Sequence, residues 1–241
     1  MSESMAYYES DGTGASSMDE TWAMKFCMQS CNQYFCEVAD SFMSDEFNLT
    51  GLSQLVPRYK EALELILDLE HENSVPIPEI PLINQSGELL YGLIHARYII
   101  TRQGLLAMLQ KYKSNDFGTC PRVLCEDTGL LPIGRSDLPG YETVRLYCPC
   151  CRDIYMPTSE RFLAVDGAFF GSSFAGMFLD IMPGIEKRAS QIRKQQFQLK
   201  MFGFNISPLA KFGPRMRWLR QTPESEDFQK SDGGGIDPSV L

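Results

Sequence analysis

Apolar side chains recur at intervals of three and four residues from position 18 to about position 113, which is the pattern of amphipathic helices. Ser17, with Glu20 three positions further on, has the arrangement of a capping box and predicts the start of the first helix. The segment 59–70 is predicted to form another helix, because three apolar side chains share one face of it: Leu63, Ile66 and Leu67.

A longer apolar stretch at 89–112 is predicted to divide into two helices near Thr101 or Gly104. Three prolines ahead of this stretch prevent the preceding helix from continuing: Pro76, Pro78 and Pro81. Residues 18–116 are therefore predicted to form a compact all-α domain.

The pattern changes after Phe117 to short strand-like pieces separated by glycine and proline. Residues 144–148 (VRLYC) and 152–156 (RDIYM) are predicted to be strands of a hairpin, and 166–182 to be a short helix or an ordered loop. Residues 117–182 are thus typical of a small antiparallel β domain. The predicted fold class is α+β, with a helical domain followed by this β domain.

Both ends of the chain, 1–17 and 222–241, are polar and rich in small residues, so they are predicted to be disordered. Residues 183–221 are expected to be an extended C-terminal segment that begins with several basic residues. Within it, the string KMFGFNI is predicted to form a hairpin in which bulky apolar side chains surround Gly203: Met201, Phe202, Phe204 and Ile206.

Composition and charge narrow the class of protein. The 241 residues are 44% hydrophobic, which is enough for a core, and no run of eighteen apolar residues suggests a membrane-spanning helix. The net charge is −9, and residues 1–90 hold 16 acidic against 3 basic side chains. An acidic N-terminal part should repel nucleic acid and attract polyamines or basic proteins, unless it is simply a solvated surface.

Four cysteines have the spacing of a closed metal site. Cys120 and Cys125 are separated by four residues, Cys148 and Cys151 by two, and a proline follows the first member of each pair. Two such turns can direct four thiolates at one point, and four soft sulfur ligands favour Zn²⁺. We therefore predict one structural zinc ion per chain.

Other uses of these cysteines are weaker hypotheses. A disulfide framework would fit a secreted chain, but the first residues lack the basic and apolar regions of a secretory leader. A catalytic zinc ion would usually keep one coordination position open to water, which four cysteines do not leave. Cys150 could in principle replace a neighbour as a ligand, although the two-residue spacing of Cys148 and Cys151 suits a metal knuckle better.

The sequence lacks the motifs of the enzymes that it could be confused with. The glycine-rich loop, strand lysine and His-Arg-Asp loop of a kinase are missing, and the two histidines, His71 and His95, do not form a zinc-peptidase motif. Both histidines are expected to be structural. Three further cysteines are expected to pack in the core, the alternative being a second metal or redox site: Cys27, Cys31 and Cys36.

The strings around the cysteines resemble the zinc region of the casein kinase II regulatory (beta) subunit family. The resemblance is not confined to the cysteines, and it extends in the family's order over about residues 20–212. The strings that carry it are FNLTGL (47–52), ALELILDLE (62–70), LYGLIHARYI (90–99), CPRVLC (120–125), LPIGRSDLPG (131–140), LYCPCC (146–151), DGAFFG (166–171) and FGFNISPLA (202–210).

The resemblance implies a regulatory protein without an active site, found in nucleus and cytoplasm. It implies a homodimer formed through the zinc region, with two catalytic subunits of casein kinase II docked on it to give a tetramer. Candidates for the dimer face are Val123, Leu124, Val144, Leu146 and Ile154. Because side chains alternate along a strand, some of these could belong to the core of the β domain instead.

The resemblance also implies a docking site for the catalytic subunit within 183–221. The family places two aromatic anchors around a glycine, and Phe202 and Phe204 occupy those positions here, supported by Met201 and Ile206. Phe202 replaces the tyrosine that is commoner in the family. Without the resemblance, both phenylalanines could equally be core residues.

Two regulatory features are expected from the family. Phosphorylation by the partner kinase is expected at Ser16 and Ser17, which have an acidic residue three positions further on, although Ser17 could serve as a helix cap alone. The family's acidic loop, proposed to bind polyamines or basic substrates, is reduced here to Glu70, Glu72 and Glu79.

Two alternatives from other classes stay open. A zinc-ribbon protein that binds nucleic acid would need free arginines beside the metal, for which Arg122, Arg145 and Arg152 are candidates, although the acidic net charge opposes it. An adaptor for unrelated partners would differ only in whether a kinase co-purifies with the chain.

Overall fold

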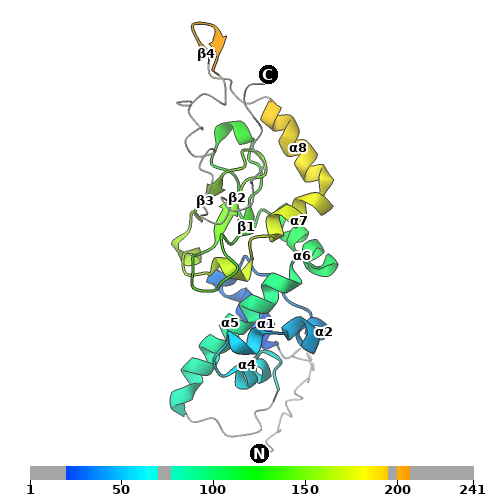
Figure 1. The fold of residues 1–241 in the computed structure, drawn as a ribbon, viewed down its shortest axis with the longest axis vertical. Helices are drawn as coiled ribbons and strands as arrows, with labels where there is room; N and C mark the ends of the chain where they lie inside the picture. The colour runs from blue at the N-terminus through cyan, green and yellow to red at the C-terminus, as the bar shows by residue number, and fades with distance from the viewer. Residues whose placement is uncertain (1–19, 70–76, 195–199, 207–241) are drawn as a thin grey trace, which may run out of the picture. The chain divides into compact units, whose positions relative to one another are not determined.

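A computed structural model describes residues 20–69, 77–194 and 200–206. These residues form two units, one of residues 20–194 and one of residues 200–206 (Figure 1). The predictions of disorder for 1–17 and 222–241 concern residues outside the described ranges.

Helices make up the first part of the larger unit, as predicted. The longest helices of this first part are α5 and α6, and α4 packs along α5 (Figure 1). The helices are α1 (Trp22–Met28), α2 (Asp40–Met43), α3 (Glu46–Leu49), α4 (Tyr59–Ile66), α5 (Ile80–Tyr98) and α6 (Arg102–Lys113), with 3-10 turns η1 (Ser30–Asn32), η2 (Leu52–Gln54) and η3 (Ile77–Glu79).

The predicted start of the first helix is wrong. The helix α1 begins at Trp22, because the side chain of Thr21 accepts the N–H of Met24 at 3.2 Å and so acts as the N-cap. The carboxylate of Asp68 accepts the N–H of Trp22 at 2.8 Å from beyond the end of α4. The capping box of Ser17 and Glu20 is thus replaced by one local and one long-range acceptor. Ser17 itself lies outside the described residues.

The predicted division of 89–112 is confirmed at Thr101. The side chain of Thr101 accepts the N–H of Gly104 at 3.2 Å and caps α6, while α5 ends at Tyr98. At the other end of α5, Pro81 lies in the first turn, where its missing N–H costs no hydrogen bond.

A small antiparallel sheet follows, in the strand order β1-β2-β3. Its strands are β1 (Leu131–Ile133), β2 (Arg145–Tyr147) and β3 (Ile154–Tyr155), and in its register Leu146 lies opposite Pro132 and Tyr155. The predicted hairpin is therefore confirmed with shorter strands. The remaining elements of this part are η4 (Val123–Cys125), η5 (Glu160–Phe162), η6 (Gly167–Phe169), α7 (Phe174–Ile181) and α8 (Pro183–Lys194).

One continuous core joins the helices to the β part. Tyr34 stacks on Phe162 with ring centroids 3.9 Å apart, and Phe35 lies 5.2 Å from Phe170. The helix α5 can approach η6 closely at Gly92, where an added Cβ would lie 2.3 Å from the ring of Phe169. The sheet that carries the cysteines is therefore held against a helical base through aromatic contacts.

His95, on α5, is fully buried at this junction. Its Nε2 accepts the N–H of Cys36 at 3.2 Å, so its Nδ1 carries the proton and donates to the carbonyl of Phe169 at 2.8 Å. The expectation of a structural histidine agrees with these contacts. Burial lowers the pKa of His95 from 6.5 to about 4, although the bond to Phe169 opposes the shift.

The free energy of unfolding is expected to fall as the pH is lowered from 6.5 to about 4. In this window the unfolded chain binds a proton at His95 that the folded chain does not, so the stability is fully present above pH 6.5 and is lost below it. The loss from this residue should reach roughly 3 kcal/mol. Urea unfolding between pH 7 and pH 5 should show a smaller pH slope for His95→Gln, and an unchanged slope would contradict the prediction.

The basic stretch after α7 is a helix at its start rather than extended chain. In α8, Ala189 and Ile192 are buried, Ile185 packs against the core, and Lys187 and Arg188 are exposed. Spacings of three and four residues between these apolar side chains explain the amphipathic helix. No single described helix is long and apolar enough to cross a membrane, although the bent pair 167–181 and 183–193, at 88°, meets the length and composition criteria when taken together.

The second unit is a hairpin of two short strands, β4 (Lys200–Met201) and β5 (Phe204–Asn205). Phe202 and Gly203 form its two-residue turn with φ angles of 50° and 84°. Positive φ at both positions matches the turns that suit the twist of a hairpin, and glycine makes the second one easy. The predicted hairpin is therefore present.

Candidate metal centre

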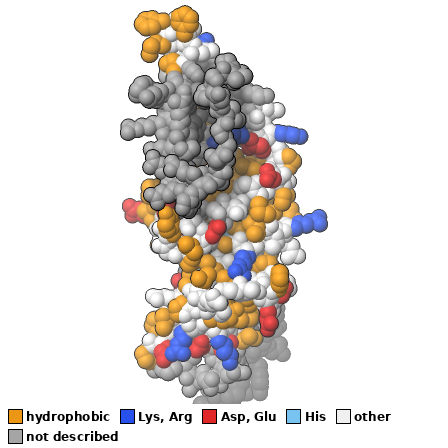
Figure 2. Space-filling model, in the orientation of Figure 1, with side chains coloured by type: hydrophobic (Ala, Val, Ile, Leu, Met, Phe, Trp, Pro, Cys, Tyr) orange, Lys and Arg blue, Asp and Glu red, His pale blue; other side chains and the backbone are white. Residues whose placement is uncertain are grey.

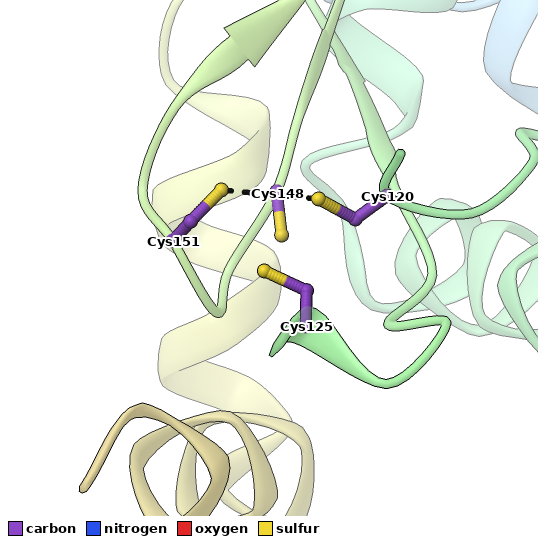
Figure 3. Close-up of side chains that lie close together, drawn as sticks. All are labelled: Cys120, Cys125, Cys148 and Cys151. Carbon is purple, nitrogen blue, oxygen red and sulfur yellow. Dashed lines mark hydrogen bonds between the residues drawn. The ribbon is translucent and has the colours of Figure 1, made fainter. Parts of the chain in front are cut away.

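Four buried cysteines converge on one point in the β part. The Sγ atoms of Cys120, Cys125, Cys148 and Cys151 all lie within 4.8 Å of one another, and those of Cys120 and Cys151 are 3.9 Å apart (Figure 3). The first pair lies in and before η4, and the second pair brackets the turn between β2 and β3.

The spacing of the sulfur atoms fits a tetrahedral metal ion. Zinc–sulfur bonds of about 2.3 Å place neighbouring sulfurs of a tetrahedron about 3.8 Å apart, whereas a disulfide requires about 2.05 Å. None of the four forms a disulfide with another described cysteine. The residues therefore fit a soft metal ion such as zinc, and the disulfide alternative does not describe this geometry.

Backbone hydrogen bonds hold both cysteine turns. The N–H of Cys148 donates to Asp153 at 3.0 Å, and the N–H of Arg152 donates back to Cys148 at 2.8 Å. In the other turn, the N–H of Cys125 donates to Arg122 at 2.9 Å. Each pair of thiols is thus set on a closed turn, as the short spacings in the sequence suggest.

The surroundings of Cys125 and Cys148 favour their protonated forms until a cation binds. Burial raises the pKa of Cys148 to about 12 and also raises the pKa of Cys125. Burial acts in the same direction on Cys120, but hydrogen bonds from the backbone of Arg122 and from Tyr155 outweigh it and lower the pKa of Cys120. A metal ion would displace these protons on binding.

Tyr155 is a part of this centre that the sequence analysis did not identify. Its hydroxyl lies 3.1 Å from Sγ of Cys151 and can donate to the sulfur when it is a thiolate. The residue sits on β3 four positions after Cys151, so a tyrosine in the strand that follows the second cysteine pair was the available signal.

The remaining cysteines lie outside this group. Cys150 is buried, yet the cluster that could hold a metal ion does not include it. In the helical part, Cys36 is in the core, where burial raises its pKa to about 12, and Sγ of Cys27 lies 3.5 Å from the hydroxyl of Tyr91. Cys31 is half-buried. Packing of Cys27 and Cys36 against the core agrees with the expectation for them.

The candidates for a dimer face divide into two groups. Val123 is 91% exposed, and Leu124 and Ile154 are exposed as well. Val144 and Leu146 are buried within the chain, so their assignment to a contact face is wrong. Leu146 faces the core from the central strand β2. Val144 directly precedes that strand, and its N–H donates a hydrogen bond to the carbonyl of Val165.

The arginines that a nucleic-acid site would need are ion-paired within the chain. Arg122 contacts Asp153 at 2.7 Å, Arg145 donates to Glu142 at 2.9 Å, and Arg152 contacts Glu186 at 3.4 Å. Their charges are therefore partly compensated, which removes the free cations on which that alternative depends.

Three of the four apolar side chains proposed for docking are exposed to solvent on the hairpin of residues 200–206. Phe202 is 95% exposed, Phe204 is 79% exposed, and Met201 is also exposed, while Ile206 is half-buried. Figure 2 shows hydrophobic side chains gathered on this hairpin. The alternative that both phenylalanines are core residues is not the arrangement seen here.

The expected regulatory residues fall mostly outside the described ranges. This holds for Ser16, Ser17, Glu70 and Glu72. Glu79 is described, and its carboxylate accepts a hydrogen bond from the guanidinium of Arg58, which precedes α4. An acidic side chain with this partner offers less net charge to a cationic ligand.

A helical base, a four-cysteine β module that could hold a metal ion and, in a separate unit, a hairpin with exposed aromatic side chains are typical of a protein that presents surfaces for binding. The model of the casein kinase II regulatory subunit family matches residues 21–205. The chain belongs to this family, and its role is that of a regulatory subunit rather than a catalytic one.

Relatives from fungi and an insect are similar over most of their length. The casein kinase II subunit beta of Candida albicans is 45% identical over 85% of this chain and 80% of its own. The corresponding subunit of Saccharomyces cerevisiae is 42% identical over 90% of each chain. The subunit beta' of Drosophila melanogaster is 45% identical over 80% of this chain and 86% of its own.

Proposed function

We propose that this regulatory subunit binds one zinc ion at the four cysteines and forms a homodimer through the surface beside them. Each chain then docks one catalytic subunit of casein kinase II through the hairpin of residues 200–206, which gives a tetramer of two catalytic and two regulatory chains. The observation that carries the proposal is the convergence of four buried sulfur atoms at tetrahedral spacing. Family membership supports the partner.

The zinc ion has a structural role in this proposal. Four sulfur ligands complete its coordination, and they connect η4 to the turn between β2 and β3. A sheet with strands of two or three residues has little core of its own, so the metal replaces packing that the sheet lacks. Val123 and Leu124, on the same η4 turn as Cys125, are thereby held on the surface.

The dimer contact is assigned to the exposed apolar side chains next to the metal: Val123, Leu124 and Ile154. An apolar side chain that is 91% exposed, as Val123 is, gains most from being covered by a second copy. The rigid turns on both sides of the cluster keep these side chains from folding inward.

Val123→Glu is expected to weaken the dimer at least about tenfold, because it places an unpaired charge in an apolar contact. Zinc content should stay at that of the wild type, since the side chain is exposed in the single chain. Sedimentation equilibrium over a concentration series checks the dissociation constant. Leu106→Glu, at an exposed apolar position on α6, is the control, and equal dimerisation of the two variants would count against this contact.

The assembly itself is tested by co-purification. The full chain is expected to retain a catalytic subunit of casein kinase II on an affinity column and to elute with it as a complex of two plus two chains. Mass measurement by light scattering and zinc analysis of the same peak check both parts. A peak that holds the kinase without zinc would contradict the structural role of the metal.

A further inference from the structure

The helix α8 packs on the cysteine module of the same unit. Ala189 and Ile192 are buried on its inner face, and the helix contacts η4, the turn that ends at Cys125. A helical ribbon in the yellow of the α7–α8 region runs behind the four sulfur atoms in Figure 3. One side of the cluster is therefore covered by a helix that supplies none of the four ligands.

Polar contacts tie the end of α8 to the other cysteine turn. The Nη2 atom of Arg193 donates to the carbonyl of Pro149 at 3.2 Å, within the turn from Cys148 to Cys151. The same nitrogen contacts the carboxylate of Glu186, about two turns earlier on the helix, at 2.9 Å. That carboxylate also contacts Arg152, the residue after Cys151, at 3.4 Å. The helix thus holds the turn at Pro149 and at Arg152.

The guanidinium of Arg193 loses much of its water at this place, which costs free energy unless a negative charge lies nearby. Its side chain is only 23% exposed, and its Nε atom is buried without a hydrogen-bond partner among the described residues. A guanidinium that loses most of its water is stabilised by anionic groups that compensate for the loss. Glu186 is one such group, but it is shared with Arg152. Four thiolates around a divalent ion would carry a net charge of about −2, and two of them would belong to the turn whose Pro149 Arg193 contacts.

We propose that α8 is a clasp that retains the metal ion, with Arg193 as a positioning residue of the site although it is no ligand. The inference rests on the proposed function, namely that the four cysteines bind zinc. Arg193 holds the turn through Pro149, so that Cys148 and Cys151 cannot swing away from the ion unless this contact breaks. Loss of the ion in turn removes the negative charge that favours the arginine at this place.

The test is the rate at which zinc leaves the full chain when an excess of a chromogenic chelator is added. Arg193→Met keeps much of the apolar stem of the side chain and removes the guanidinium. It is expected to release zinc about tenfold faster than the wild type, since residues that orient ligands typically change metal affinity by about 10- to 100-fold. Arg188→Met is the matched control, because it removes the same charge from an exposed position of the same helix. Equal release from the two variants overturns the clasp.

A second variant keeps the test decisive if Arg193→Met does not fold. Arg193→Lys retains the positive charge, but its ammonium ends about one bond short of Nη2 and lacks the planar guanidinium. Faster release than in the wild type is expected, and a wild-type rate would overturn the role of the contact with Pro149. If the wild type purifies without zinc, the proposed function itself fails. Bound zinc with a release rate insensitive to Arg193 rejects the clasp alone.

Discussion

Cys120→Ser and Cys148→Ser are each expected to abolish zinc binding and dimerisation together. Each variant removes one of four sulfur atoms that lie within 4.8 Å of one another, from a different turn in each case. Structural zinc sites contribute about 10 to 16 kcal/mol to folding in small domains, so the loss of one ligand should unfold the local β module. Zinc analysis alongside sedimentation velocity checks both effects, and a stable metal-free dimer would contradict the proposal.

Cys150→Ala is the matched control for these variants. Cys150 lies between two of the four cysteines in the chain and is buried like them, but it is not one of the four converging sulfurs. Zinc content and dimerisation should therefore stay at the level of the wild type. A loss of zinc in this variant would show that Cys150 is a ligand.

The double variant Phe202→Ala/Phe204→Ala is expected to lose binding of the catalytic subunit. Truncation of an aromatic anchor at an interface typically costs about 2 kcal/mol or more, so the pair should weaken binding by roughly a thousandfold. Both side chains are exposed in the free chain, and their removal should leave zinc content and the dimer unchanged. Calorimetric titration with the catalytic subunit measures the change.

Phe47→Ala provides the comparison for this loss. Phe47 lies on α3 and is 84% exposed, so it matches the anchors in size and exposure but not in position. Its replacement should leave the affinity within a factor of about three, because exposed side chains outside an interface contribute little. Undiminished binding by the double variant would show that the hairpin is not the docking site.

Local signals in the sequence were sufficient where the deciding contacts lie within a few residues. The break between α5 and α6 at Thr101 is set by a cap contact between Thr101 and Gly104, three residues apart. The hairpin at Gly203 is set by the positive φ angles of its two-residue turn. The start of α1 was predicted too early, because two cap signals compete there. Ser17 fits a capping box, but Thr21 is the residue that accepts an N–H from the helix.

Signals that depend on distant partners could not be resolved in the same way. Val144 and Leu146 looked equivalent to Val123 as apolar surface residues, and only the packing of the sheet buried them. The start of the C-terminal segment was expected to be extended, yet α8 became a helix with its apolar face against the β module. Which side chains of a strand or helix are buried depends on the segment that packs against it.

By itself, the sequence determined the four converging cysteines, the α+β class and the paired turns, because the spacing of cysteines, apolar positions and glycines acts over a few residues. The tertiary structure decided which side of each strand is covered, that Arg122 and Arg152 have acidic partners, and that Arg193 reaches Pro149 from 44 positions away. These features depend on contacts between segments far apart in the chain. Local sequence patterns do not show which distant segments will be in contact, because those contacts form only when the core packs.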